Sequence, residues 1–218
     1  MPPSTPQSTL RVDVEGARLE VPTDTQLELL ARRAAEPGAI LPRGDEYFVK
    51  WLAGRTPEAI ERDRIARVRA NRDLTARPGW TLDLAVLVDG EPVGLQSVSG
   101  FDRWPARRIV GTTSWLLRSH QGRGIGTRCR AAVLELAFAH LKAESAKSWV
   151  LRDNRASVAV STRLGYRHVA TNRLEEHGLA LTELVYQLDA PQWLDSASRR
   201  AVAPVVTGAG GLVTLLST

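Results

Sequence analysis

The chain has 218 residues, of which 43% are hydrophobic and 24% charged, and its formal net charge is +5. This composition suits a globular domain with a hydrophobic core, and no apolar run reaches the ~18 residues of a membrane span. The only cysteine, Cys129, excludes an internal disulfide. The first nine residues lack the basic start and apolar stretch of a secretory signal. We therefore expect a cytoplasmic protein without a membrane partner.

The basic balance favours an anionic partner, which could be a nucleic acid or a phosphorylated cofactor. The six tryptophans are spread along the chain and form no aromatic–basic platform, so no nucleic acid is expected. Four histidines and one cysteine are too scattered to predict a metal site.

The first part of the chain predicts one hairpin and two helices. Residues 1–8 are rich in Pro, Ser and Thr and are expected to be disordered. Alternating apolar and polar residues over 10–21 predict a hairpin or bent strand. A capping-box pattern at Thr23 predicts a helix over about 23–35, and a second helix is expected over about 56–73.

The pattern changes after residue 79, where strand signals dominate. The elements expected from there are strands over 82–88, 92–99 and 108–117, a Gly-rich loop over 121–126, a helix to about 141, a strand over 148–151, a helix over 154–164, and strands over 166–170 and 180–188. This order indicates a mixed α/β fold (α+β layered), not a doubly wound one. Residues 9–195 are expected to form a single domain, and residues 196–218 form a C-terminal tail with no assigned element.

The segment from Arg118 to Thr127 follows a strand and opens a helix. Its glycines allow a tight turn and the close approach of a ligand. The unpaired N–H groups at a helix start, together with the helix dipole, suit a phosphate. No lysine follows the glycines as a P-loop requires, and Thr127 and Cys129 occupy the third glycine position of a dinucleotide fingerprint. The alternative is a glycine-rich turn that only caps the helix.

The spacing Q-x-x-G-x-G, formed by Gln121, Gly124 and Gly126, resembles the pyrophosphate-binding signature of the GNAT acyltransferases. The glycine loop alone would be moderately specific, but a second motif follows it in the order that this family shows.

That second motif begins at Asn154 and Ser157 and continues to the Leu-Gly-Tyr sequence at 164–166. It resembles the N-x-x-S … LGF segment of the Rim-type branch, the ribosomal-protein N-acetyltransferase-like enzymes, with Tyr166 in place of the usual Phe. The resemblance extends over about 79–188. The chain is also similar to relatives whose donor is a longer acyl-CoA such as succinyl-CoA.

The resemblance implies the GNAT fold, in which a mixed central sheet flanked by helices splays apart between the strands at about 108–117 and 147–152. The pantetheine of acetyl-CoA or another acyl-CoA would lie in that gap, and its pyrophosphate on the Gly-rich loop. The donor-binding residues implied in this way are Trp115, Leu116, Leu117, Arg118, Gln121, Gly122, Arg123, Gly124, Ile125, Gly126, Thr127 and Asn154.

The implied reaction is direct attack of a neutral amine on the thioester, which makes the protein an N-acyltransferase without a metal. Ser157 matches the position where Rim-type enzymes place a hydroxyl that protonates the leaving thiolate; the alternative is a solvated serine. Asn154 would contact the pantetheine arm, or would only cap a helix.

The general base is left open, because the strand over 108–117 carries no carboxylate. The candidates considered are Asp83, expected on a solvent-facing strand position, and Glu91, Asp102 and His120. The loop acids Asp45 and Glu46 are interpreted as a binding site for a cationic acceptor or as a solvated loop.

Two other functions remain open at this stage. The chain could be a catalytically inactive acyl-CoA-binding module, or it could take its acyl group from an acidic carrier protein docked on the arginine-rich helix over 56–73, whose arginines could equally form a solvated face. Cys129 and Trp115 are interpreted as packing residues, with Trp115 a possible wall of the acyl pocket. A homodimer through the C-terminal strands or tail is plausible.

Overall fold

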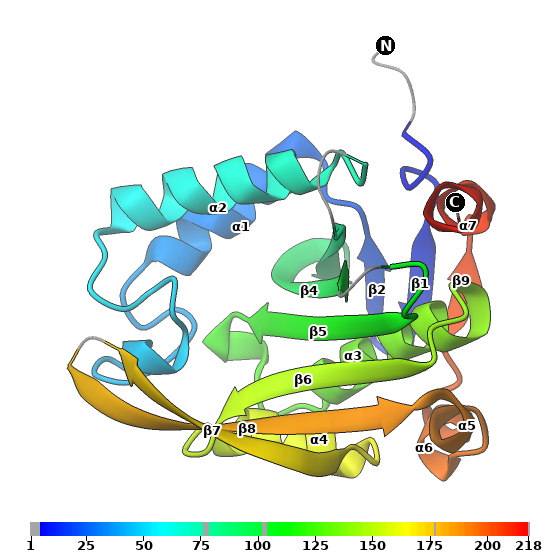
Figure 1. The fold of residues 1–218 in the computed structure, drawn as a ribbon. Helices are drawn as coiled ribbons and strands as arrows, with labels where there is room; N and C mark the ends of the chain where they lie inside the picture. The colour runs from blue at the N-terminus through cyan, green and yellow to red at the C-terminus, as the bar shows by residue number, and fades with distance from the viewer. Residues whose placement is uncertain (1–4, 76–78, 102–103, 177, 218) are drawn as a thin grey trace.

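The computed structural model describes residues 5–75, 79–101, 104–176 and 178–217. Its centre is a sheet of nine strands in the order β7-β8-β6-β5-β4-β3-β2-β1-β9. Helices α1 and α2 lie on one side of this sheet and α3 and α4 on the other (Figure 1). The predicted mixed α/β architecture is therefore confirmed. None of the described helices is long and apolar enough to cross a membrane.

The predicted strands and helices lie close to their predicted positions, except that the strand expected over 166–170 continues to Glu176. The tail over 196–218, to which no element was assigned, contains one strand and two helices within its described residues. The strands are β1 (Arg11–Val14), β2 (Ala17–Glu20), β3 (Thr81–Val88), β4 (Glu91–Phe101), β5 (Ile109–Leu116), β6 (Ser145–Leu151), β7 (Arg167–Glu176), β8 (Leu179–Asp189) and β9 (Val205–Thr207). The helices are α1 (Asp24–Ala35), α2 (Pro57–Asn71), α3 (Ile125–Glu135), α4 (Arg155–Arg163), α5 (Ala190–Leu194), α6 (Ala197–Val202) and α7 (Gly210–Leu216). Short 3-10 turns lie at Glu46–Phe48 and Arg118–His120, and a π-helical turn at Leu136–His140 continues α3.

The start of α1 follows directly from its sequence. The Thr23 hydroxyl accepts a hydrogen bond from the Gln26 N–H at 3.2 Å, and the Gln26 side chain accepts one from the Thr23 N–H at 2.8 Å. Two N–H groups that a helix start leaves unpaired are thereby satisfied. The apolar side of the helix, with Leu27 and Leu30, packs on the sheet.

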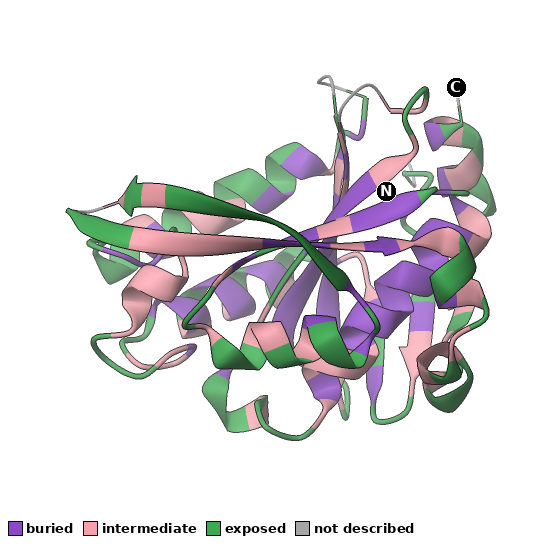
Figure 2. Ribbon diagram, turned by 60° about the horizontal axis from the view of Figure 1, so that its bottom comes forward, coloured by how far each residue is buried: buried purple, intermediate pink, exposed green. Residues whose placement is uncertain are grey.

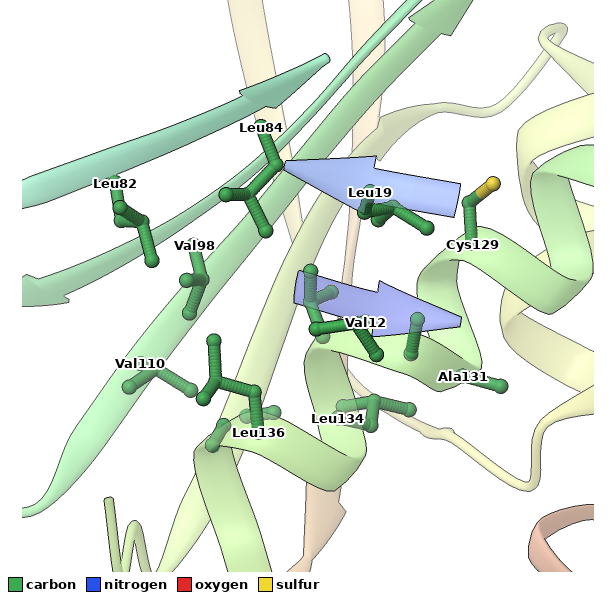
Figure 3. Close-up of a cluster of buried hydrophobic side chains, with 14 of the residues drawn as sticks. Val12, Leu19, Leu82, Leu84, Val98, Val110, Cys129, Ala131, Leu134 and Leu136 are labelled. Carbon is green, nitrogen blue, oxygen red and sulfur yellow. The ribbon is translucent and has the colours of Figure 1, made fainter. Parts of the chain in front are cut away.

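Helix α3 is the central element of the opposite layer. Residues from Cys129 to Leu134 are all buried, and all except Arg130 are apolar or small. Figure 3 shows this helix against inward-facing side chains of several strands, including Val12, Leu82 and Val110. Burial on nearly all sides fixes the position of the helix start relative to the strand ends.

The sheet opens between β5 and β6. These two strands run parallel and pair at only three positions, which are Ile109 with Ser145, Val110 with Ala146 and Gly111 with Lys147. Beyond them β5 pairs only with β4, and β6 only with β8. The predicted splay is confirmed. We call the gap between residues 112–116 and 148–151 the V.

Both ends of the chain add to this fold. Residues 1–8 were expected to be disordered, but among those described Gln7 is buried, and its side chain donates a hydrogen bond to the Arg72 carbonyl at 2.6 Å. Within the unassigned tail, β9 pairs with β1 and so extends the sheet. Helix α7 follows, and its Leu216 carbonyl accepts a hydrogen bond from the Trp104 indole at 2.7 Å.

One buried carboxylate connects this C-terminal part to α3. Glu135 is 7% exposed and accepts hydrogen bonds from the Trp193 indole at 3.1 Å and from the Arg199 guanidinium at 2.7 and 2.8 Å. Burial alone would raise the pKa of Glu135, but the bonds from Arg199 and Trp193 outweigh it and hold that pKa below its ordinary value. The charged form therefore stabilises the fold.

We predict that Glu135→Gln lowers the free energy of unfolding by about 1.5–3 kcal/mol near neutral pH, because hydrogen bonds to a charged acceptor are lost. The folded pKa lies below the unfolded one, so this contribution is complete above about pH 4.5 and disappears as the pH falls through the folded value. Urea unfolding of both proteins at several pH values measures the difference. The control is Glu61→Gln, whose exposed partner Arg32 lies 3.8 Å away; its effect should stay below about 1 kcal/mol. Equal losses in both variants would contradict the prediction.

Candidate functional site

The Gly-rich loop ends in a helix start with free N–H groups. Gly122 and Gly124 adopt φ values of +73° and +75°, which favour glycine, and Gly124 is the N-cap of α3. The Arg128 N–H donates to the Gly124 carbonyl at 3.1 Å. The N–H groups of 122–127 find no acceptor among the described residues. They are available to an anion, as the sequence predicts.

Gln121 holds this loop in place. Its side-chain amide donates to the Leu116 carbonyl at 2.8 Å and to the Ile40 carbonyl at 2.7 Å. The Arg118 N–H donates to the Ala39 carbonyl at 2.7 Å. The signature glutamine therefore ties the end of β5 and the segment after α1 to the loop, so that the free N–H groups have a fixed orientation.

Three arginines lie in or next to the Gly-rich loop in the chain. Arg118 and Arg123, predicted from the sequence, are exposed. Arg128, which sequence reasoning missed, lies against Gly124 and donates to the Arg123 carbonyl at 3.4 Å. Arg128 lies one turn into α3, and a side chain at that position points back over the helix start. This position in the sequence could have identified it as a phosphate-binding candidate. The site therefore offers concentrated positive charge to a phosphate group.

The predicted strand-end residues differ in their surroundings. Leu116 and Leu117 have buried side chains, and the Leu117 N–H donates to the Val93 carbonyl at 2.8 Å. Trp115 is half-buried on the face of the sheet that α1 covers, with its ring edge-on to Trp51 at 5.7 Å. The side chain of Trp115 therefore lies on the side of the V away from α3.

The second motif forms the start of α4. The Asn154 side-chain oxygen accepts a hydrogen bond from the Ser157 N–H at 3.1 Å, so Asn154 caps the helix. Ser157 is half-buried in the first turn. Helix α4 packs against β6 and α3, which brings this turn to the same layer as the start of α3.

A polar cluster, buried except for Ser114, lies between α3 and the two arms of the V. The Arg130 guanidinium donates to the Ser114 hydroxyl at 3.0 Å and to the Ser148 hydroxyl at 3.2 Å. The Tyr166 hydroxyl lies 3.3 Å from that of Thr112. Burial raises the pKa of Tyr166, although Arg130 and Thr112 oppose this shift. Tyr166 is thus a protonated core residue.

Sequence reasoning did not single out Arg130. The sequence does show a basic residue within the continuous apolar stretch of α3. A charge in such a stretch is expected only where a specific partner compensates it, so this position could have been recognised.

On the opposite face the structure corrects the prediction for Asp83. This residue was expected to face solvent, but it is 6% exposed and accepts hydrogen bonds from the Ser97 hydroxyl and, at 2.7 Å, from the Asn71 amide. The reason is that α2 covers this face of β3, while the other face packs in the core that contains α3. Strand register aligns Asp83 with Ser97 and Ser97 with Thr113, so a row of polar residues leads from Asp83 to the V.

The other candidates for a base are less favourably placed. Glu91 has an exposed side chain 3.5 Å from Arg33 at the β3–β4 turn. His120 lies beside the Gly-rich loop, with a ring nitrogen 2.9 Å from the Ser119 hydroxyl. Asp102 lies outside the described residues. Of the loop acids, Glu46 accepts a hydrogen bond from the Gly44 N–H at 2.7 Å, and Asp45 precedes the 3-10 turn.

The β7–β8 hairpin forms one wall beside the V. It extends beyond the rest of the sheet, and Figure 2 shows that its outer part is exposed or half-buried. Lys50 pairs with Glu176 at 2.5 Å and so joins the α1–α2 connection to the end of this hairpin. Trp149, 40% exposed, and Glu183 lie on the same face of β6 and β8 as Thr113. This half-enclosed face carries aromatic and acidic groups that could hold a cationic amine.

The arginines of α2 are largely engaged within the chain. Arg69 and Arg72 both pair with Asp24, Arg62 pairs with Asp63, and the Arg64 guanidinium lies 4.5 Å above the Trp51 ring. Most of these arginines therefore interact with groups of the same chain, and the helix offers little free positive charge to an acidic partner. No group of three or more His, Cys, Asp or Glu side chains that could hold a metal occurs in the part of the chain that the structure describes.

Comparison with known proteins agrees with this geometry. A family model described as "Acetyltransferase (GNAT) domain" matches residues 26–167, more than half of the chain. RimJ of Mycobacterium smegmatis, solved in complex with CoA-disulfide, has a TM-score of 0.68 at 21% identity over 91% of this chain and 95% of its own. A GCN5-related N-acetyltransferase from Brucella melitensis has a TM-score of 0.67 at 16% identity, over 88% and 83%.

A ribosomal-protein-S5-alanine acetyltransferase from Vibrio fischeri has a TM-score of 0.60 at 16% identity, over 84% of this chain and 98% of its own. At such identities these likenesses establish the fold alone. That Rim-type enzymes are among these neighbours agrees with the resemblance seen in the second motif.

Cys129 lies next to the site but is not reactive. It is 1% exposed in the core, and burial raises the pKa of its thiol to about 12, against a smaller opposing effect of Arg128. A thiol in this state is neither a nucleophile nor readily modified.

We predict that Ellman's reagent at about pH 8 labels less than ~0.1 equivalent of the folded protein within minutes and one equivalent in urea. Because this is the only cysteine, rapid labelling of the folded protein would contradict the prediction directly.

Proposed function

We propose that this chain, which belongs to the GNAT acetyltransferase domain family, transfers an acetyl or longer acyl group from coenzyme A to a primary amine of a small molecule or protein. Membership of this family identifies it as a transferase. The observation that carries the proposal is that two features of the structure lie next to each other. The free N–H groups of 122–127 lie at the end of β5, and the V opens along the same strand.

These features fit the two parts of an acyl-CoA. The N–H groups of the Gly-rich loop, with Arg118, Arg123 and Arg128, would bind the pyrophosphate. The unpaired edge of β5 beyond Gly111, near Trp115, would hydrogen-bond the pantetheine amides as a strand would. Held at both points, the thioester end is directed toward the closed end of the V, at Gly111 and Lys147.

The acceptor amine would approach from the face covered by α1 and α2, since the Gly-rich loop and α4 belong to the other side. In direct transfer the amine nitrogen forms a bond to the thioester carbon, the C–S bond breaks, and the thiolate leaves. The Ser157 hydroxyl, in the first turn of α4, is proposed to protonate this thiolate. Trp149 and Glu183 are suited to hold the acceptor before it reacts.

The amine must also lose a proton, and we propose Asp83 as its destination. Among the candidates considered, Asp83 is the carboxylate on the acceptor face, and its oxygen is hydrogen-bonded to the Ser97 hydroxyl. Ser97 is aligned with Thr113 at the mouth of the V. A water beside Thr113 would complete the path from the amine through Ser97 to Asp83.

The donor site is tested by Gly124→Glu. We predict that isothermal titration shows CoA affinity reduced by about tenfold or more, since a carboxylate would be placed on the anion site and a side chain forced into a positive φ. The matched control is Gly90→Glu, because Gly90 also has a positive φ, +82°, but lies in the β3–β4 turn with open space around it. Unchanged CoA affinity in Gly124→Glu, or no CoA binding by the wild type, would overturn the proposed donor site.

The proton path is tested by Asp83→Asn. We predict a fall in kcat of about 10²–10⁴-fold with CoA affinity unchanged, because the amide keeps the shape but cannot accept the proton. The assay follows release of the CoA thiol from acetyl-CoA with a panel of amino acids, polyamines and peptides. Asp89→Asn, in the exposed β3–β4 turn, is the control and should retain full turnover. Normal kcat in a folded Asp83→Asn protein would exclude Asp83 from proton transfer.

The same assay separates this proposal from its alternatives. Binding of acyl-CoA without turnover on any amine would favour a non-catalytic binding module. Turnover only with an acylated carrier protein would favour the carrier-dependent reaction, for which the self-paired arginines of α2 offer little support.

A further inference from the structure

Arg130 is a buried arginine. Its side chain is 3% exposed, in the middle of α3. Its guanidinium donates hydrogen bonds to Ser114 on β5 and Ser148 on β6, and it also interacts with the Tyr166 hydroxyl. These serines lie just beyond the last β5–β6 pair, Gly111 with Lys147. The cation therefore bridges the two arms of the V close to its closed end.

This guanidinium has only neutral partners. Within the described residues no carboxylate lies within ion-pair distance of Arg130, and its Nε atom has no hydrogen-bond acceptor. Arg199, in the same layer and more exposed, is by contrast paired with Glu135. A charge removed from water is costly unless an opposite charge and well-aligned hydrogen bonds compensate it. A buried, unpaired guanidinium beside an open gap thus points to an anionic ligand.

The position of Arg130 along the V indicates which part of a ligand it would meet. The Gly-rich loop lies at the open end and the Gly111–Lys147 pair at the closed end. A donor held by its pyrophosphate and by the strand edge near Trp115 has its thioester next to Ser114, and its acyl chain extends inward from there. Ser114 is exposed, so a carboxylate in the V that replaced the Ser114 hydroxyl as acceptor would reach the guanidinium, which is itself buried.

We propose that Arg130 binds a carboxylate at the far end of the acyl chain, so that the preferred donor is the CoA thioester of a short dicarboxylic acid, of the malonyl or succinyl class. This inference rests on the proposed function, because it presupposes that acyl-CoA lies in the V. An acetyl group would place a methyl against an unpaired cation. A terminal carboxylate supplies the missing charge, and its two oxygens match the paired donors of a guanidinium.

The test compares donors that share a length but differ in charge. Isothermal titration is performed with succinyl-CoA, with butyryl-CoA, whose chain ends in a methyl where succinyl has its carboxylate, and with CoA alone. For the wild type we expect succinyl-CoA to bind about tenfold or more tightly than butyryl-CoA. In Arg130→Met this preference should vanish while CoA affinity stays within about threefold.

Arg130→Lys keeps the charge without the paired donors, and should retain a reduced preference for succinyl-CoA. It also keeps the inference testable if Arg130→Met does not fold, which protection of the Cys129 thiol reports. Two outcomes would show that Arg130 only braces the strands. One is equal affinity of the wild type for succinyl-CoA and butyryl-CoA, and the other is an equal loss of affinity for all three ligands in both variants. Binding of CoA with no preference would refute this inference alone, whereas no binding of CoA would refute the proposed function as well.

Discussion

The site depends on the short parallel pairing between β5 and β6. Three residue pairs hold the strands together, and the strands then separate because each has its other edge fixed, β5 by β4 and β6 by β8. Separation leaves backbone N–H and C=O groups inside the fold without strand partners, which is unfavourable unless water or a ligand satisfies them. The same divergence gives a gap that widens between two strands, each held by its other neighbour. A ligand that pairs with a strand edge can therefore occupy a position that the sheet itself leaves open.

Helix α3 links this gap to the rest of the molecule. Its first turn carries the free N–H groups, its middle carries Arg130 beneath the V, and its end carries Glu135, which accepts hydrogen bonds from the C-terminal segment. A helix is a rigid rod with a rise of about 1.5 Å per residue, so these positions cannot shift independently. Burial of the helix on nearly all sides transmits this rigidity from the core to the site. The C-terminal segment thereby contributes to a site that it does not touch.

Sequence reasoning recovered what local patterns encode. Spacing alone located the helix caps at Thr23 and Asn154 and the Gly-rich loop, because caps and tight turns depend on a few adjacent residues. It failed for Asp83, since an alternating pattern does not reveal that both faces of β3 are covered. It also missed Arg130, whose partners Ser114 and Ser148 come from two other strands. Contacts between residues far apart in sequence are set by topology, which no local spacing reveals.

The site is divided between the two faces of the sheet because successive side chains of β5 point to opposite faces. Thr113 and Ser114 are neighbours on β5, yet Thr113 lies in register with Ser97 on the α2 side, and Ser114 bonds to Arg130 on the α3 side. In the proposed reaction, donor recognition therefore belongs to one face and acceptor chemistry to the other, and the two meet only where β5 and β6 diverge. Such an arrangement separates a buried cation, suited to an anionic acyl end, from the carboxylate that would take the proton of an amine. On a single face these opposite charges would neutralise each other, so the sheet between them is what allows both to remain available.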